Sequence, residues 1–457
     1  MTSTGYIQPG PAVTVYPGSA ANVTTTMRGF EVDGYLANYG FGVGGSKFYR
    51  VRDVSASLTH TISGSADPIT AHDIVYYEAG GLQYYFYSWL DSSGSGDIGR
   101  ARPFSSTYLD NWWTGTMSAS ALHNVSGDIS NSPISLAVGR NDVLYATNGR
   151  YIASYDGTTA QPQALDLNAN YETQDVLWMA DRLYIPTRHA SWGKSYSSIY
   201  IWDGTTNSWE TEVPVAGMVG AGYVLNGIYY QFYYDRQGTN KLAYLEGNRL
   251  VDLVGYDNGP KPPAFYQVTD WRGFLVWTPG PDSADVYTYG SSGNGDTPRL
   301  FHLADAGTSG TGLGGGLSNL LDNQGILVAN NGQLYYLDTE NLTNYETTNA
   351  TWKSTLFDIA GDRQNAGQIN AIRFNFEALT SGAVLDWSLV NNQGKTVYSD
   401  TISYAKATAD NPLHTLTTAY YPLNGKVTEN FRVELSYANG STTAPVRVMN
   451  IKVYGEG

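Results

Sequence analysis

Alternating apolar and polar positions recur along the middle of the chain, and each run ends in a turn residue. The clearest copies are Tyr151-Ile-Ala-Ser-Tyr-Asp-Gly157, Ile199-Tyr-Ile-Trp-Asp-Gly204 and Leu242-Ala-Tyr-Leu-Glu-Gly247. Val286-Tyr-Thr-Tyr-Gly290 and Leu334-Tyr-Tyr-Leu-Asp338 are looser copies. A period of two is typical of strands that bury one face. The pattern therefore predicts one strand-and-turn unit, repeated several times.

The spacing of these copies predicts the architecture. Aligned on Tyr155, Trp202, Leu245, Tyr289 and Leu337, they lie roughly 43 to 48 residues apart. This is close to the length of one four-stranded propeller blade. Such a unit cannot bury its own hydrophobic face, so it must stack on copies of itself. Strand-like segments from Phe30 onward give seven units, the first two placed partly by spacing, so six or eight blades stay open.

The hairpins of this repeat carry their own signals. Asp156-Gly157, Asp203-Gly204, Asn226-Gly227 and Asn331-Gly332 are dipeptides that favour two-residue turns of type I′. Both central residues of that turn need a positive φ, which Asn, Asp and Gly adopt most readily. We therefore expect tight hairpins at these four places.

Two further segments flank the predicted propeller, which spans residues 27–350. Residues 1–26 are rich in Pro, Gly, Ser and Thr, with one strand-like piece, Ala12-Val-Thr-Val-Tyr16. We expect an extended arm that adds a strand to the last blade or reaches a neighbouring subunit. From residue 351 to 457 longer alternating segments such as Val384-Leu-Asp-Trp-Ser-Leu-Val390 replace the blade pattern. They predict a jelly-roll-like β-sandwich, so the whole chain is predicted to be all-β.

Composition narrows the classes of function. The 457 residues carry a formal net charge of −15, with only 15% charged residues and 37 tyrosines. No Lys/Arg cluster is present, which argues against sequence-specific nucleic-acid binding. The absence of cysteine excludes disulfides and thiol catalysis. Neither a signal peptide nor an apolar run of membrane-spanning length is visible, so we expect no membrane insertion.

Residues that could carry chemistry form no recognisable motif. The six histidines, His60, His72, His123, His189, His302 and His414, are widely separated, and each is interpreted as a surface or loop residue. We find no metal-ligand spacing, no nucleophile elbow and no phosphate-binding loop, because the glycine-rich stretch 307–316 lacks a following Lys and helix. The sequence thus predicts no enzyme, no metal site, no cofactor and no catalytic residue.

Paired aromatic residues offer a different kind of site, because exposed rings can stack on sugars. The candidates are Trp112-Trp113, Tyr229-Tyr230, Tyr233-Tyr234 and Tyr420-Tyr421. Neighbouring residues on a strand point to opposite faces, so one ring of each strand pair must be packed inside. Trp112 and Trp113 stand in a polar stretch and are the pair most expected to be exposed as a glycan-stacking site.

The start of the C-terminal segment carries a resemblance. The sequence Thr351-Trp-Lys-Ser-Thr-Leu-Phe-Asp358, followed by Gln368-Ile-Asn-Ala-Ile-Arg-Phe-Asn-Phe376, resembles the junction in tailed-bacteriophage tail and neck proteins. In these proteins a divergent propeller is followed by a module that opens on Trp-Lys-Ser. The resemblance covers the architecture of residues 27–457 and is sharp over about residues 350–378. It implies rings around a DNA channel, or adhesin parts that face the host.

These observations predict a non-catalytic structural component of a phage virion, in a tail or neck ring. Its expected partners are copies of itself and other virion proteins, and its expected location is the virion, after synthesis in the host cytoplasm. One alternative is an adhesin that binds a host-surface glycan or receptor. A second alternative is a propeller that hydrolyses or eliminates a polysaccharide. The sequence leaves open the position in the virion and the size of any ring.

Overall fold

The computed structural model describes about two thirds of the chain. The described residues are 13–15, 24–32, 35–42, 47–51, 57–61, 68–79, 81–91, 96–101, 109–110, 134–191, 196–256, 261–278, 285–291, 298–305, 316–320, 325–330, 333–338, 351–354, 367–391, 393–406, 413–428, 431–437 and 445–456. Strands dominate this part of the chain, and the helices within it are single 3-10 turns. No helix among the described residues is long and apolar enough to cross a membrane.

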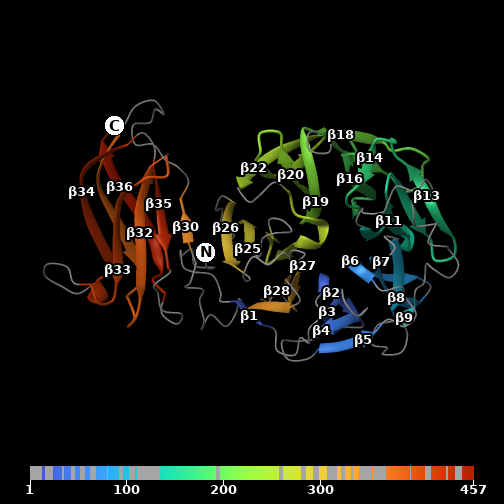
Figure 1. Ribbon diagram of the computed structural model, residues 1–457, viewed down its shortest axis with the longest axis horizontal. Helices are drawn as coiled ribbons and strands as arrows, with labels where there is room; N and C mark the ends of the chain where they lie inside the picture. Colours follow the sequence, from blue (N-terminus) through green and yellow to red (C-terminus); the bar gives the residue numbers. More distant parts are fainter. Residues whose placement is uncertain are drawn as a thin grey trace. The chain divides into compact units, whose positions relative to one another are not determined.

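Seven sheets built from consecutive strands form the blades of a propeller (Figure 1). The first blade contains β2 (Thr24–Val32), β3 (Tyr35–Gly42), β4 (Lys47–Val51) and β5 (Ser57–Thr61). The second contains β6 (Pro68–Ala79), β7 (Leu82–Asp91), β8 (Gly96–Ala101) and β9 (Leu109–Asp110). The third contains β10 (Leu136–Val138), β11 (Leu144–Asn148), β12 (Tyr151–Tyr155) and β13 (Ala160–Asp166). The fourth contains β14 (Tyr171–Thr173) and β15 (Leu177–Met179), which share an edge, then β16 (Arg182–His189), β17 (Ser197–Trp202) and β18 (Thr211–Val215).

The remaining blades follow the same order. The fifth contains β19 (Gly217–Leu225), β20 (Ile228–Asp235), β21 (Asn240–Glu246) and β22 (Arg249–Tyr256). The sixth contains β23 (Val268–Trp271), β24 (Phe274–Trp277), β25 (Asp285–Gly290) and β26 (Arg299–Asp305). The seventh contains β27 (Gly316–Leu320), β28 (Gly325–Asn330) and β29 (Gln333–Asp338). The seventh sheet takes its fourth strand, β1 (Val13–Val15), from the N-terminal arm. The predicted all-β fold class is confirmed. Of the two roles predicted for the arm, the structure shows the addition of a strand to the last blade.

Side chains between neighbouring blades form the core of the propeller. Leu144, Ala146 and Ala153 of the third blade pack on Tyr77 and Phe86 of the second. The opposite face of the third blade meets the fourth through buried aromatic residues, among them Tyr145, Tyr200 and Trp202. The third blade thus buries both faces, as a repeat of this length requires.

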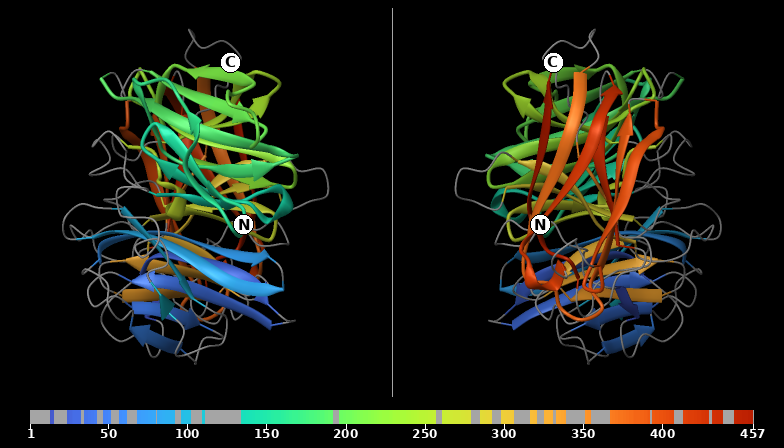
Figure 2. Two further views of the ribbon diagram at one scale, coloured as in Figure 1. Left: turned by 90° about the vertical axis from the view of Figure 1, so that its right-hand side faces the viewer. Right: turned by 90° about the vertical axis from the view of Figure 1, so that its left-hand side faces the viewer.

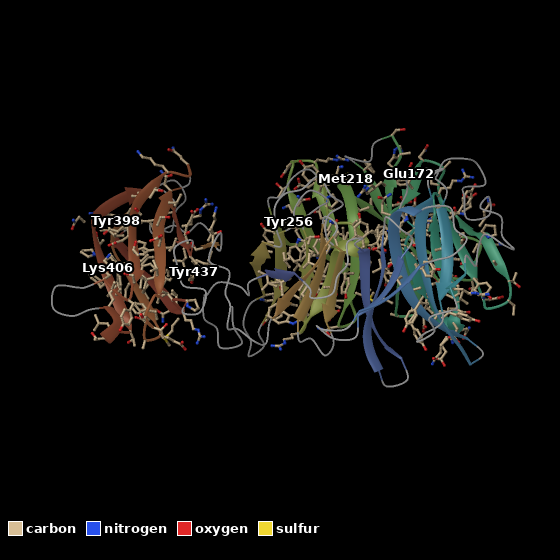
Figure 3. The ribbon with its side chains drawn as sticks, turned by 60° about the horizontal axis from the view of Figure 1, so that its bottom comes forward. Glu172, Met218, Tyr256, Tyr398, Lys406 and Tyr437 are labelled. Atoms are coloured by element: carbon tan, nitrogen blue, oxygen red, sulfur yellow. The ribbon has the colours of Figure 1, made fainter. Side chains whose placement is uncertain are left out.

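The C-terminal segment is a two-sheet sandwich, whose strands run side by side in the right-hand view of Figure 2. One sheet has the order β30-β35-β32-β33 and the other β34-β31-β36. Its strands are β30 (Thr351–Lys353), β31 (Gly367–Phe376), β32 (Val384–Asn391), β33 (Thr396–Ser403), β34 (Thr418–Thr428), β35 (Phe431–Ser436) and β36 (Val448–Glu456). The inner faces bury a cluster around Phe374, Trp387 and Tyr421, in which Trp387 lies 4.9 Å from each of the other two rings, centroid to centroid. Tyr437, labelled in Figure 3, belongs to the same core.

The chain divides into two compact units that are described separately. One comprises Thr14–Val286 and Ala306–Leu337 and contains most of the propeller. The other comprises Met1–Val13, Tyr287–Asp305 and Asp338–Gly457 and contains the sandwich.

Candidate functional site

The inner strands of three blades carry a one-residue irregularity at corresponding places. The β6–β7 register shifts between Ala71 and Asp73, and the β19–β20 register shifts between Val219 and Gly222. In the fourth blade the inner edge is interrupted between β14 and β15, which pair with the same strand β16. A bulge frees backbone groups from the sheet and re-aims the adjacent side chain. These irregularities place polar groups at the centre of the propeller.

Asp73, which follows the bulge of β6, forms hydrogen bonds within its own blade and to the next blade. Its backbone N–H donates to Ser88 Oγ at 3.1 Å, and its Oδ1 accepts the N–H of Ile74 at 2.8 Å. The other oxygen, Oδ2, accepts the N–H of Leu136 in the third blade at 2.9 Å. A carboxylate that accepts backbone N–H groups is a strong hydrogen-bond partner, so Asp73 ties the second blade to the third.

His72 lies beside this aspartate and departs from the prediction of a surface histidine. Its side chain is buried, and Nδ1 accepts the N–H of Ile134 at 3.0 Å. Burial lowers the pKa of His72 to about 3, which keeps the ring neutral. The interpretation as an exposed residue was wrong because the bulge turns His72 inward, where its ring satisfies a backbone donor of the next blade.

Ser135 and Asp175 repeat the same connection in the next two blades. Ser135 Oγ donates to Asp175 Oδ1 at 2.6 Å and accepts the N–H of Val176 at 3.3 Å. Asp175 Oδ2 in turn accepts the N–H of Gly222 in the fifth blade at 3.0 Å. We call Asp73, Ser135 and Asp175 the hub residues. Each accepts a backbone N–H from the inner edge of the following blade.

Backbone groups freed by the bulge of β19 bond to a side chain of β20 and to a neighbouring segment. Gln231 Nε2 donates to the carbonyls of Gly220 and Ala221 at 3.1 and 3.0 Å. The N–H of Ala221 donates to the carbonyl of Pro263 at 2.7 Å. Buried backbone groups are rarely left without partners, and here a neighbouring segment supplies one of them.

That segment, residues 261–267, forms a plug at the centre of the ring. It ends in the 3-10 turn η2 (Phe265–Gln267), which contacts β19, β27 and β2, the inner strands of the fifth, seventh and first blades. Gly220 permits the close approach, because a Cβ built there would lie 2.4 Å from the carbonyl oxygen of Pro263. Phe265 is buried at this position.

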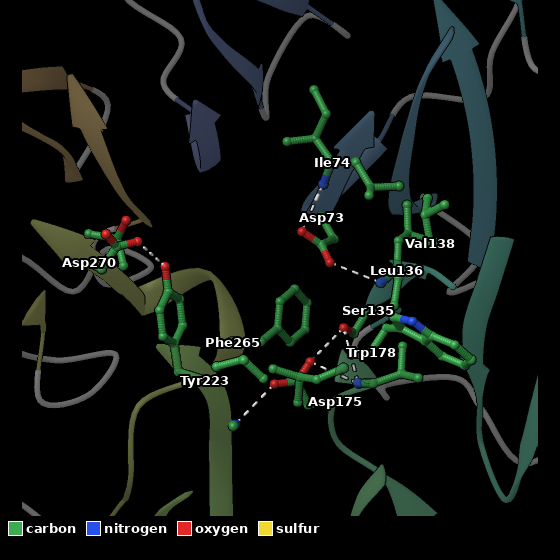
Figure 4. A pocket seen from close by; sticks show the side chains of 17 residues that line it. Asp73, Ile74, Ser135, Leu136, Val138, Asp175, Trp178, Tyr223, Phe265 and Asp270 are labelled. Carbon is green, nitrogen blue, oxygen red and sulfur yellow. Dashed lines mark hydrogen bonds between the residues drawn. The ribbon is translucent and has the colours of Figure 1, made fainter. Parts of the chain in front are cut away.

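A cavity of about 360 Å³ is lined in part by the hub residues and by Phe265 of the plug (Figure 4). Its lining comes from the plug and from the inner edges of the second to sixth blades. It consists of Asp73, Ile74, Val75, Ser135, Leu136, Ala137, Val138, Asp175, Val176, Leu177, Trp178, Gly222, Tyr223, Val224, Phe265, Thr269 and Asp270. These lining residues include three carboxylates and three aromatic rings but no Lys, Arg or His. The cavity therefore combines apolar walls with acidic and hydroxyl groups, an arrangement typical of small-molecule sites.

Two half-exposed groups face each other across this cavity. On one side, the Tyr223 hydroxyl donates to Asp270 Oδ1 at 2.7 Å. On the other, the indole of Trp178 is held by stacking on Tyr145, with ring centroids 6.1 Å apart and planes 7° apart. Among the described residues Asp270 Oδ2 accepts no hydrogen bond within the protein. This oxygen is therefore available to a hydroxyl or amine of a bound molecule.

Burial changes the acidity of the hub. The pKa of Asp175 is raised to about 7, chiefly by removal of its carboxyl group from water, while the hydrogen bonds from Ser135, Gly222 and Val176 act in the opposite direction. The charge of Asp73 also raises this pKa. At neutral pH Asp175 is therefore close to half protonated, which reduces the negative charge at the floor of the cavity.

The predicted glycan-stacking residues, Trp112 and Trp113, lie outside the described residues. Of the other aromatic pairs, Tyr229 is buried while Tyr230 is half-buried, and Tyr421 is buried while Tyr420 is 60% exposed. The sequence did not single out Asp73, Asp175, Trp178, Tyr223 or Asp270. One signal could have found the hub, because Asp73, Ser135 and Asp175 each stand directly before an apolar residue.

Comparisons with known proteins establish the fold alone. No family model matches the chain, and no curated protein matches it. A catalytically inactive virginiamycin B lyase from Staphylococcus aureus, crystallised with quinupristin, is similar with a TM-score of 0.50 and 10% identity, over 72% of this chain and 99% of that one. A gluconolactonase from Xanthomonas campestris gives a TM-score of 0.39 and 11% identity, over 73% of this chain and 99% of that one. The extracellular domains of Drosophila Semaphorin 1a give a TM-score of 0.46 and 9% identity, over 73% of this chain and 89% of that one.

The first of these likenesses corrects the prediction that the chain is no enzyme. That prediction was wrong because it rested on the absence of contiguous motifs, whereas this chain shares its fold with a lyase. The cavity shows the physical reason. Its carboxylates and hydroxyls come from five blades and are spread from residue 73 to residue 270, so no local sequence pattern could have revealed or excluded them.

Proposed function

We propose that the protein is a carbohydrate-binding propeller whose central cavity takes a neutral sugar of one or two rings. The observation that carries the proposal is the position of the Tyr223–Asp270 pair opposite Trp178, across a cavity of about 360 Å³. Sugars present hydroxyl groups at their edges and C–H groups on their ring faces. A carboxylate beside an indole offers both of the complementary surfaces.

The charges around the cavity argue for a neutral ligand. The three carboxylates and the absence of a cationic side chain among the lining residues disfavour an anionic molecule. A purely apolar ligand is disfavoured as well, since it would remove water from Asp270 and Tyr223 without replacing their hydrogen bonds. Asp73 and Asp175 already accept backbone N–H groups, which leaves Asp270 as the carboxylate that can receive sugar hydroxyls.

The N-terminal arm favours glycan recognition over the predicted role as a ring component. The prediction of a virion ring used this arm as a strap between subunits. In the structure β1 instead completes the seventh blade of its own propeller. The placement of the protein in a phage tail stays a prediction from the sequence resemblance, and labelling of purified virions with an antibody against the chain would test it.

Isothermal titration with a panel of neutral mono- and disaccharides tests the cavity directly. We expect at least one saturable ligand, with affinity reduced about tenfold or more by Trp178→Ala and by Asp270→Asn. Tyr223→Phe removes only the hydroxyl group that positions Asp270 and should give a smaller loss. Asp166→Asn, which changes an exposed carboxylate on β13, serves as the matched control and should bind normally.

The same samples separate binding from catalysis. Chromatography of the saccharide after long incubation shows whether it is converted. Turnover that Asp270→Asn abolishes would uphold the site and make the protein an enzyme. Absence of binding to the whole panel, or binding that survives both Trp178→Ala and Asp270→Asn, would refute the proposed function.

A further inference from the structure

The sheet β34-β31-β36 of the sandwich has an outer face organised in three cross-strand rows. From one end to the other, the rows are Pro422, Ala371 and Tyr454; Tyr420, Arg373 and Lys452; and Thr418, Asn375 and Asn450. The alternate residues of the same strands, among them Phe374 and Tyr421, point into the core. We call these nine residues the outer face.

The middle row carries an unusual arrangement of charge. Arg373 and Lys452 are direct cross-strand partners, and like charges in this position destabilise a sheet. Among the described residues neither forms an ion pair. Elsewhere in the sandwich Lys406, Arg432 and Arg447 each contact a carboxylate. In a chain of net charge −15, two adjacent cations without a carboxylate form a local site for an anionic group.

Two exposed tyrosine rings adjoin these cations. Tyr420 is 60% exposed and Tyr454 is 42% exposed, and their ring centroids lie 6.3 Å apart. They come from the two edge strands of this sheet. Tyr454 is the cross-strand partner of Ala371, whose small side chain is fully buried, and Tyr420 is the partner of Arg373 in the next row. Large exposed aromatic groups are uncommon on a surface that contacts only water, and they mark binding surfaces.

The third row supplies fixed polar groups. Asn375 Oδ1 accepts hydrogen bonds from Arg373 Nε and Thr418 Oγ1, each at 3.1 Å. Asn375 Nδ2 donates to Asn450 Oδ1 at 2.9 Å. These bonds hold the arginine and the two amides in place, and pre-organised groups lose less entropy when a ligand binds.

We infer that the outer face binds an anionic polysaccharide. Carboxylate or sulfate groups would pair with Arg373 and Lys452, and sugar rings would pack against Tyr420 and Tyr454. Adjacent rows lie about 7 Å apart along the strands, so the face is long enough to contact more than one sugar unit. The surface is made of other residues than the propeller cavity, and the inference does not depend on what the cavity binds.

The test is native gel electrophoresis of the full chain through gels that contain polygalacturonate, chondroitin sulfate or uncharged dextran. We expect retardation by the first two polymers, weakening as salt rises, and none by dextran. The two anionic polymers distinguish carboxylate from sulfate as the preferred group. Retardation by dextran equal to that by both anionic polymers, or none by any polymer, would overturn the inference.

Variants locate the binding surface. The double variant Arg373→Gln/Lys452→Gln and the single variant Tyr420→Ala should each weaken binding about tenfold or more. Lys395→Gln removes an exposed lysine outside this sheet and should bind like the wild type. Trp178→Ala, which damages the proposed cavity, should also be retarded normally, so failure of either proposal can be told from failure of the other. Thermal unfolding checks that each variant keeps its fold.

Two results would assign the face to something else. If the double variant loses binding while Tyr420→Ala does not, simple ion exchange explains the retardation and the saccharide inference fails. If single-stranded DNA binds more tightly than both polysaccharides, with the same dependence on Arg373 and Lys452, the face is a phosphate site and the inference fails as well.

Discussion

Asp175 Oδ2 accepts the backbone N–H of Gly222 at 3.0 Å, although the two residues are 47 positions apart and belong to different blades. Asp73 makes the corresponding bond to Leu136, 63 positions away. Blades also meet through apolar side chains, which fix distance better than register. These directional bonds set the height at which one inner strand meets the next, and therefore the geometry of the cavity above them.

The raised pKa of Asp175 predicts an unusual dependence of stability on pH. Its folded-state pKa of about 7 lies above the ordinary value of 3.8. The folded protein thus holds this proton more tightly, and stability is lost as pH rises from about 4 to 7. Between pH 5 and 8 the loss is on the order of 3 kcal/mol. We expect the melting temperature of the wild type to fall over this range relative to that of Asp175→Asn.

Asp203 provides the control for this experiment. Desolvation is the largest single effect and raises the pKa of Asp203, but the hydrogen bonds from Thr206 and Thr205 together outweigh it and hold this pKa at about 2. Its carboxylate is ionised in both the folded and unfolded states above pH 5, so Asp203→Asn should keep the wild-type slope. Parallel slopes for the wild type and Asp175→Asn would show that Asp175 does not titrate in this window.

Gly220 is predicted to tolerate no side chain. A Cβ at this position would lie 2.4 Å from Pro263 O and 2.7 Å from Pro262 Cβ, so Gly220→Ala must displace the plug. Overpacking of this kind costs about 1–3 kcal/mol. Gly255→Ala is the matched control, because its nearest neighbour is a methyl group of Thr239 at 3.2 Å. Thermal unfolding should show a clear loss for the first variant, and equal loss for both would contradict the role of the plug.

Gln231 is predicted to be a large contributor to the stability of the fifth blade. It is fully buried, and its Nε2 donates to the carbonyls of Gly220, Ala221 and Phe232. Gln231→Leu keeps the approximate volume but leaves these carbonyls without that donor, at a cost of about 1–3 kcal/mol for each group left unsatisfied. Gln161→Leu, at an exposed position of β13, should be nearly neutral in the same melting experiment.

Deletion of residues 1–16 removes β1 and should weaken the seventh blade. The outer edge of β29 would then have unpaired N–H and C=O groups, which favour association between chains. We expect a lower melting temperature and a concentration-dependent increase in apparent size on gel filtration. Deletion of residues 1–10 leaves β1 in place and is the control. A normal melting temperature for the longer deletion would show that closure does not depend on β1.

The repeat predicted most of the propeller because it reflects equivalent strands. Tyr155, Trp202, Leu245, Tyr289 and Leu337 all lie on the third strand of their blades, β12, β17, β21, β25 and β29. These positions are apolar because both faces of a blade are covered, which makes the pattern visible in the sequence. The hub was missed since a single Asp or Ser before an apolar residue resembles an ordinary turn or strand residue.

Turn chemistry was predicted only in part. Asn226 and Gly227 have φ values of 53° and 75°, as a type I′ turn requires. At Asp156-Gly157 only the glycine has a positive φ, because Asp156 Oδ1 instead accepts N–H groups from Thr158 and Thr159 and caps a longer loop. Asp203 does the same in the fourth blade. Asn331-Gly332 lies outside the described residues.

Completion of the last blade by β1 has a consequence for synthesis of the protein. The strand Val13–Val15 pairs with Gln333–Asp338, so the first partner leaves the ribosome long before the second. At about 5–20 residues per second, the delay is on the order of tens of seconds. During this time six blades can form as an open stack with an exposed edge. Nascent chains stopped before residue 333 should therefore depend on chaperones, while longer ones can close.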